Sequence, residues 1–209
     1  MRRTLINQLL KQDDENTYFL TADVGYGLLE PLKEKMGDRL INIGIAEPSM
    51  INIAAGLALA GKKVYTYTMC CFYLKCIEEI KLDLCAMNLP VTMIGVGTGF
   101  DYEQHGISHF ALEDERIIDS LLNVDVTTPQ TKDDLVNYLK TSDMRFPFSS
   151  PAYLRVGRFG EGKEFGTDLH IRQKYPTEGG SLDYYKKAYG YINNLYATPK
   201  PTEETNILY

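Results

Sequence analysis

One carboxylate, that of Glu47, stands alone in an otherwise uncharged stretch over residues 42–61. Alternating isoleucines precede it, as at the end of a strand, and Pro48 follows it, a residue favoured in the first turn of a helix. Residues 48–60 are apolar or small on nearly every side, which predicts a helix buried all round and closed by Gly61. A charge buried at such a corner is costly. We therefore expect Glu47 to serve general acid–base catalysis, with capping of the helix as the alternative.

Two histidines, His105 and His109, lie in the run H-G-I-S-H-F, after an expected strand over 91–96. Gly106 between them predicts a loop rather than one face of a helix. Loops at the carboxyl ends of parallel strands are where such sheets bind ligands. We expect the pair to contact substrate or to transfer a proton, with a structural role in a turn as the alternative. The remaining histidine, His170, is far along the chain, so no metal site is predicted.

Two arginines, Arg155 and Arg158, stand at or just past the last expected strand, in Y-L-R-V-G-R-F. A guanidinium there can bind a phosphate or carboxylate through paired hydrogen bonds, or can be a solvated surface group. A further set, Met69, Phe72 and Lys75, is spaced three apart at the entry to an expected helix and should share one face. Judged alone, Phe72 is more typical of a core than of a platform for a cofactor.

The elements that must position these groups alternate between strand and helix with short connections. This pattern predicts an α/β fold with three layers, helix–sheet–helix, around a mostly parallel six-stranded sheet. The domain should span residues 1–160, and a tyrosine-rich, partly helical extension should span 161–209. Expected helices cover residues 4–11, 28–36, 48–60, 72–87, 113–121 and 131–141, and expected strands cover 17–22, 39–43, 63–68, 91–96, 124–128 and 152–156.

Composition excludes several classes of function. The chain has 209 residues, a net charge of −6 and scattered basic residues, which argues against nucleic acid as a partner. No apolar run would span a membrane and the start lacks a long apolar signal core, so we expect a cytoplasmic protein. The cysteines form no C-x-x-C pair, which favours buried thiols in a reducing compartment over a zinc site. The glycine runs D-V-G-Y-G and G-V-G-T-G lack dinucleotide-binding spacing.

Seven runs occur in a characteristic order: A-D-V-G, D-R-L-I-N-I-G-I-A-E, A-A-G-L-A-L-A-G, N-L-P-V, H-G-I-S-H-F-A-L-E-D, N-V-D-V-T-T-P and Y-L-R-V-G-R. Over residues 1–160 they make the chain similar to the pyrimidine-binding domain of the transketolase family, whose members use thiamine diphosphate. The fold of that family agrees with the alternation of strands and helices described above.

Carried over position by position, the resemblance implies a role for each candidate residue. Glu47 matches the glutamate that hydrogen-bonds a ring nitrogen of the cofactor's aminopyrimidine and activates the cofactor. Phe72 matches the aromatic residue that stacks on the pyrimidine, and Asp23 matches an acid near the thiazolium. His109 matches a histidine that contacts the donor sugar, and Arg158 matches the arginine that binds the acceptor phosphate.

Other positions depart from the family pattern. His105 stands where transketolases have an acid that contacts a substrate hydroxyl, and Gly97 stands where the spacing expects a histidine. Met69 and Lys75 replace further aromatic residues of the pyrimidine pocket. The resemblance therefore implies cofactor contacts for Met69 and Lys75 and a substrate contact for His105, while the identity of the sugar stays open.

The part of the family that binds the diphosphate is missing from this sequence. In the family, a separate domain carries G-D-G and a later asparagine that hold Mg²⁺ or Ca²⁺, and this chain has no G-D-G. The resemblance thus implies a split enzyme, a heterotetramer or other hetero-oligomer, in which a partner chain supplies the metal and binds the diphosphate. The implied reaction transfers a two-carbon ketol unit between sugars or sugar phosphates.

Three alternatives remain open at the level of the sequence. Two are decarboxylating relatives, similar to deoxyxylulose-phosphate synthase or to the beta subunit of 2-oxoacid dehydrogenases. The third is a non-catalytic subunit that only assembles or regulates a partner. The retained acid Glu47 argues against this last reading, because a scaffold has no use for a buried carboxylate.

Overall fold

A computed structural model describes residues 1–12, 14–145 and 150–158. Its centre is a six-stranded sheet, entirely parallel, in the order β2-β1-β3-β4-β6-β5. The predicted α/β fold and its six-stranded sheet are therefore confirmed. The strands are β1 (Thr17–Thr21), β2 (Leu40–Asn42), β3 (Lys63–Met69), β4 (Val91–Val96), β5 (Asp125–Thr127) and β6 (Ala152–Val156).

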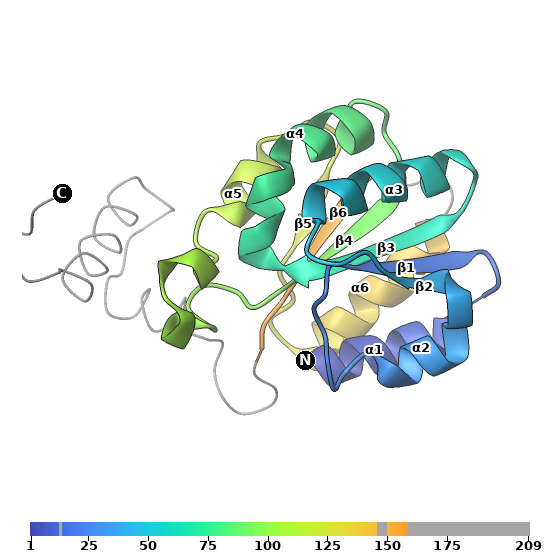
Figure 1. The fold of residues 1–209 in the computed structure, drawn as a ribbon, viewed down its shortest axis with the longest axis horizontal. Coiled ribbons are helices and arrows are strands. Elements are labelled where there is room, and N and C mark those ends of the chain that lie inside the picture. The colour runs from blue at the N-terminus through green and yellow to red at the C-terminus, as the bar shows by residue number, and fades with distance from the viewer. Residues whose placement is uncertain (13, 146–149, 159–209) are drawn as a thin grey trace, which may run out of the picture. The chain divides into compact units, whose positions relative to one another are not determined.

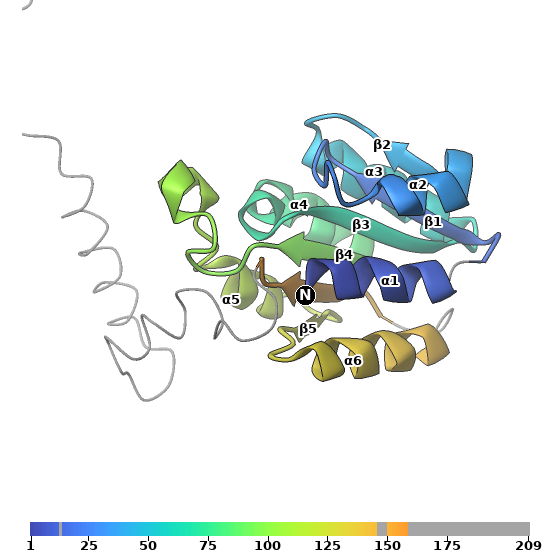
Figure 2. The ribbon, with the colours of Figure 1, turned by 90° about the horizontal axis from the view of Figure 1, so that it is seen from below.

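Helices cover both faces of the sheet (Figure 1). One face carries α1 (Arg2–Gln12), α2 (Glu30–Met36) and α6 (Lys132–Arg145), and α1 and α6 lie side by side (Figure 2). The other face carries α3 (Glu47–Leu59), α4 (Ile77–Glu79) and α5 (Asp114–Asp119). Short 3₁₀ turns at Gly37–Arg39, Glu103–His105 and Ile107–His109 complete the described elements. None of the described helices combines the length and the apolarity needed to cross a bilayer.

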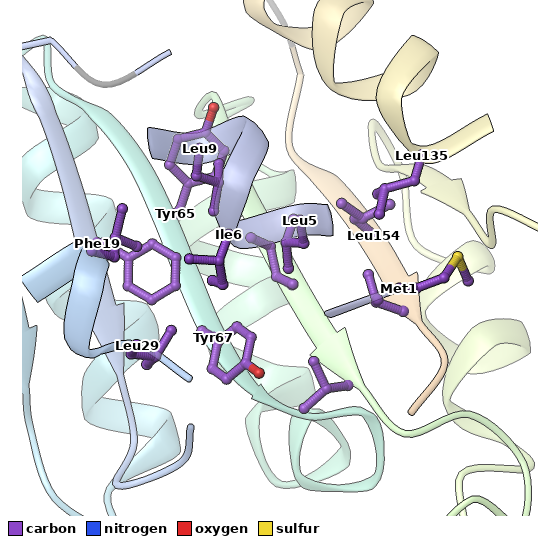
Figure 3. Packing of buried hydrophobic residues seen from close by; sticks show 14 of the residues in the cluster. Met1, Leu5, Ile6, Leu9, Phe19, Leu29, Tyr65, Tyr67, Leu135 and Leu154 are labelled. Carbon is purple, nitrogen blue, oxygen red and sulfur yellow. The ribbon is translucent and has the colours of Figure 1, made fainter. Parts of the chain in front are cut away.

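Each face of the sheet has its own apolar core, as burial on both sides of a parallel sheet requires. Under α1, the side chains of Leu5, Ile6 and Leu9 pack toward aromatic residues of the strands, among them Phe19 and Tyr67 (Figure 3). On the opposite face, residues of α3 and of the segment after β3 pack on β1, β3 and β4. These two layers fix the strands rigidly and leave the strand ends free to carry a site.

The structure corrects two expectations about the helices. The segment expected as one helix over 72–87 is a 3₁₀ helix over Cys70–Cys76, then α4, then a π helix over Ile80–Cys85. Helix α3 was expected to be buried all round, but Ile53 and Leu59 are exposed because they face away from the sheet. The expected end of α3 is confirmed: Gly61 has φ +76° and its N–H bonds the carbonyl of Ala58.

Because every strand runs in the same direction, all carboxyl ends meet at one edge of the sheet. The turns that follow β1, β2, β3, β4 and β6 carry nearly all of the candidate residues, and the loop after β4 projects from this edge (Figure 1). The expected extension over 161–209 and its boundary at residue 160 lie outside the described residues.

Candidate active site

Glu47 begins α3 directly after the turn that follows β2. Gly44, at φ +75°, makes this turn, and the Asn42 side chain holds it by accepting hydrogen bonds from the N–H groups of Gly44 and Asp23, both at 3.0 Å. The Glu47 side chain is 3% exposed, and among the described residues its carboxylate accepts no hydrogen bond. Its close polar partner there is the Lys75 ammonium, with 3.6 Å between Nζ and Oε2. A buried acid with such incomplete pairing is available to a ligand.

The three residues spaced three apart do share one face, although the helix that aligns them is not an α-helix. A 3₁₀ helix has three residues per turn, so side chains at i and i+3 eclipse one another. Met69 precedes the 3₁₀ helix and is buried, Phe72 is half-buried against the same apolar cluster, and Lys75 is exposed. The Lys75 Nζ lies 4.5 Å from the Phe72 ring centroid, so this lysine contacts both the aromatic ring and the carboxylate of Glu47.

The two histidines stack on the other side of Phe72. The His109 ring meets Phe72 edge-on, with 5.4 Å between centroids, and the His105 ring lies 5.0 Å from that of His109. The Ser108 hydroxyl lies 3.0 Å from His109 Nδ1. Burial and the neighbouring charges of His105 and Lys75 lower the pKa of His109 below its usual 6.5, so its neutral imidazole is favoured at neutral pH.

Tyr102 and two arginines continue this arrangement. The Tyr102 ring lies 6.1 Å from that of His105, and the guanidinium carbon of Arg158 lies 4.7 Å from the Tyr102 centroid. Arg2, at the start of α1, donates a 3.3 Å hydrogen bond to the Tyr102 hydroxyl. Both arginines line a cavity of about 370 Å³, together with Arg3, Lys132 and residues of α1 and of the loop before α2.

A continuous row of contacts therefore joins Glu47 to Arg158, through Lys75, Phe72, His109, His105 and Tyr102. The sequence identified all of these members except Tyr102, and it also missed Arg2. Tyr102 stands in the same loop as the histidines, which was an available signal. No sequence signal places Arg2 here, because its position depends on how α1 packs.

Asp23 lies at the same edge but outside this row. It has φ +55°, is exposed, and accepts a hydrogen bond from the Asn42 amide at 3.1 Å. With Asn42, Tyr26 and Lys33 it lines a separate hollow of about 220 Å³. The structure thus gives Asp23 a turn-forming role, and its expected position near a thiazolium stays a prediction.

Arg155 is placed differently from the expectation of a substrate contact. Its side chain is 2% exposed, and its guanidinium binds both oxygens of Asp114 at 2.8 and 3.1 Å and Glu115 at 2.7 Å. Tyr153 adds a 2.7 Å hydrogen bond to the same Asp114 carboxylate. Burial alone would lower the pKa of Arg155, but the facing carboxylate of Asp114 outweighs it and the pKa is raised. Arg155 is therefore a structural cation that ties β6 to α5.

The four cysteines are free and buried. Burial raises the pKa of the Cys71 and Cys76 thiols to about 12, so neither supplies a thiolate nucleophile at neutral pH. Among the described residues there is also no cluster of three or more side chains that could hold a metal ion. The chemistry available at this edge is thus that of a buried acid, an aromatic ring, a histidine pair and a set of cations.

The model of the transketolase pyrimidine-binding domain family matches residues 3–159. One of the two chains of a split relative, the apulose-4-phosphate transketolase of Actinobacillus succinogenes, is 28% identical over 76% of this chain and 49% of its own length. The 1-deoxy-D-xylulose-5-phosphate synthase of Fusobacterium nucleatum is 34% identical over 95% of this chain and 36% of its own. The chain thus spans half or less of these relatives.

Among solved structures, a split-gene transketolase, described as an inactive beta4 tetramer, superposes with a TM-score of 0.65. It is 26% identical, and the match covers 76% of this chain and 51% of that chain. This likeness agrees with the parallel sheet and the flanking helices described above.

Proposed function

The chain belongs to the transketolase pyrimidine-binding family, and from this premise we propose that it is one subunit of a split, thiamine-diphosphate-dependent transketolase-like enzyme. The enzyme would transfer a two-carbon ketol unit between sugars or sugar phosphates, and a partner chain would complete its active site. The observation that carries the proposal is the buried Glu47 carboxylate, which accepts no hydrogen bond among the described residues and lies beside Phe72 across Lys75.

The residues present fit the aminopyrimidine half of this cofactor. A buried carboxylate oxygen without a hydrogen-bond donor suits a ring nitrogen that carries a proton. The half-buried Phe72 offers an aromatic face, and the buried Met69 closes the pocket floor. Thiamine diphosphate, when bound, supplies the carbanion and electron-sink chemistry. Glu47 holds and returns the proton at the ring nitrogen, and Lys75 neutralises the acid while the site is open.

The other end of the row would bind the sugar. The neutral imidazole of His109 can exchange a proton with a substrate hydroxyl or hydrogen-bond it, and His105 lies beside it. Beyond them, the cavity lined by Arg2, Arg3, Lys132 and Arg158 includes no acidic side chain among its lining residues. Four cations around one hollow favour an anionic group, such as the phosphate of a sugar phosphate.

A pyrophosphate-binding partner would hold the cofactor's diphosphate through Mg²⁺ or Ca²⁺. Two findings support a partner: related chains are named as a transketolase subunit and as a split-gene transketolase. Large apolar side chains are also exposed close to Glu47 in sequence, with Ile45 79% and Ile53 42% exposed. Exposed apolar residues beside a site often mark a protein interface. The free, buried thiols further support a reducing, cytoplasmic location.

Substitution of Glu47 tests the proposal in a complex reconstituted with a pyrophosphate-binding chain that contains G-D-G. We expect Glu47→Gln to lower kcat for ketol transfer by about 10²–10⁴-fold, the usual contribution of general acid–base catalysis. Folding and assembly should be preserved, because the amide matches the acid in size. Glu34→Gln, on the exposed face of α2, is the matched control. Unchanged turnover in Glu47→Gln would favour a non-catalytic subunit, and turnover by this chain alone would exclude the split arrangement.

A decarboxylating synthase is the second candidate, because the Fusobacterium nucleatum synthase matches 95% of this chain at 34% identity. The same reconstituted complex separates the two reactions. A decarboxylating enzyme releases CO₂ from a 2-oxoacid donor, whereas a transketolase uses a ketose donor and releases none. CO₂ release that depends on Glu47, without ketol transfer, would favour the synthase.

A further inference from the structure

We propose that Tyr102 is a positioning residue that sets the separation of Arg2 and Arg158, and so tunes the cavity for the anionic end of the substrate. The inference rests on the proposed function for the identity of that substrate. It rests on the structure for the two contacts that Tyr102 makes with the arginines. Tyr102 itself is absent from the cavity lining, so it acts through the arginines rather than by touching the ligand.

The two arginines come from opposite ends of the described chain. Arg2 begins α1, and Arg158 follows β6, yet both line the same cavity. Tyr102 contacts each in a different way: its hydroxyl accepts a hydrogen bond from Arg2 at 3.3 Å, and its ring face lies 4.7 Å from the guanidinium carbon of Arg158. Two like charges near one hollow repel each other, and each contact with the tyrosine offsets part of that cost.

Tyr102 is in turn fixed by the backbone beneath it. Its ring packs on Gly97 so closely that a Cβ at this glycine would lie 2.2 Å from Tyr102 Cε2. Gly97 has φ +79°, a conformation that glycine adopts readily. The neighbouring Asp101 carboxylate accepts hydrogen bonds from the N–H of Thr98 at 3.0 Å and of Arg158 at 2.8 Å. The loop after β4 and the end of β6 are therefore held together around the tyrosine.

Such an arrangement pre-organises the cations. A guanidinium that is already held in place loses less side-chain entropy when an anion binds than a freely moving one does. The phenol hydroxyl and the ring face contribute separately, so they can be removed separately. Tyr102→Phe removes the hydrogen bond from Arg2 and keeps the ring under Arg158, whereas Tyr102→Leu removes both contacts.

Titration of the purified full chain with inorganic phosphate, followed by NMR, tests the inference directly. We expect the wild-type chain to bind phosphate and Arg158→Met to lose most of that binding. Tyr102→Leu should weaken binding roughly 3- to 30-fold, the range expected for loss of a cation–π contact. Tyr102→Phe should weaken it less, by roughly 2- to 10-fold for one lost hydrogen bond. The NMR spectra also show whether each variant is folded.

Tyr18→Leu is the matched control, since Tyr18 lies on β1 with Lys62 Nζ 5.9 Å from its ring, at the opposite edge of the sheet. It should leave phosphate binding unchanged. In the reconstituted complex, Tyr102→Leu should raise KM for a phosphorylated acceptor and leave kcat and the KM of an unphosphorylated acceptor unchanged. A purely structural role would lower kcat for both acceptors.

The outcomes are distinguishable. Phosphate binding by a folded Tyr102→Leu chain equal to that of the wild type overturns the inference, as does a wild-type chain that does not bind phosphate. If the Leu variant does not fold, the Phe variant decides in the same way. Phosphate binding that depends on Tyr102, in a complex without ketol transfer, supports the inference while the proposed function fails.

Discussion

The assignment of Arg155 as a structural cation makes a quantitative prediction about stability. Its guanidinium is almost fully buried and binds Asp114 through two hydrogen bonds and Glu115 through a third. Removal of one partner from a buried ion pair leaves an uncompensated charge and typically costs about 3–5 kcal/mol. Both Arg155→Met and Asp114→Asn should therefore lower the free energy of unfolding by about this amount, a large part of the roughly 5–15 kcal/mol typical of a domain.

Urea unfolding, followed by circular dichroism, measures the effect. With an m-value of about 2 kcal/mol/M, a loss of 3–5 kcal/mol moves the midpoint down by roughly 1.5–2.5 M. Asp119→Asn is the matched control, because Asp119 lies on the same helix but is exposed. Its midpoint should stay within a few tenths of a molar of the wild type, since surface substitutions cost little, about 0.5 kcal/mol or less.

The double variant Arg155→Met with Asp114→Leu refines the argument. It removes the two central charges together, so it should be more stable than the sum of the single losses predicts. The reasoning is refuted if Arg155→Met unfolds at the wild-type midpoint and instead raises KM for a phosphorylated substrate. Arg155 would then be the substrate contact that the sequence suggested.

Two further predictions concern the row between Glu47 and Arg158. Lys75→Met should lower the free energy of unfolding of the cofactor-free chain by at most about 1 kcal/mol, because the lysine is half exposed and its pairing with Glu47 is screened by solvent; a urea midpoint equal to that of the exposed-residue control Lys81→Met would show that the pair contributes nothing. His109 should titrate below pH 6.5 in an NMR experiment, because burial, His105 and Lys75 disfavour its charged form. His105→Asn or Lys75→Met should move that midpoint upward by removing a like charge, and an unmoved midpoint in both variants would leave burial as the sole cause.

Much of the fold and of the candidate site followed from local sequence patterns. Alternation of strands and helices predicted a parallel sheet, and a parallel sheet brings the carboxyl ends of its strands to one edge. Glu47, Phe72, His109 and Arg158 all follow such strand ends, so their arrival at one edge needed no knowledge of packing. The spacing of Met69, Phe72 and Lys75 likewise predicted a shared face, although only the structure showed that a 3₁₀ helix provides it.

Contacts between distant segments were decided by the tertiary structure alone. Side chains alternate along a strand, and only the position of α5 reveals that Arg155 and Tyr153 both meet Asp114, which turned an expected substrate contact into a buried ion pair. Arg2 reaches Tyr102 only because α1 packs where it does. The sequence by itself determined which residues reach the ligand-binding edge, because strand direction follows from local alternation. Which cation faces a ligand and which faces a carboxylate depends on packing between segments far apart in the chain, and no local pattern encodes that.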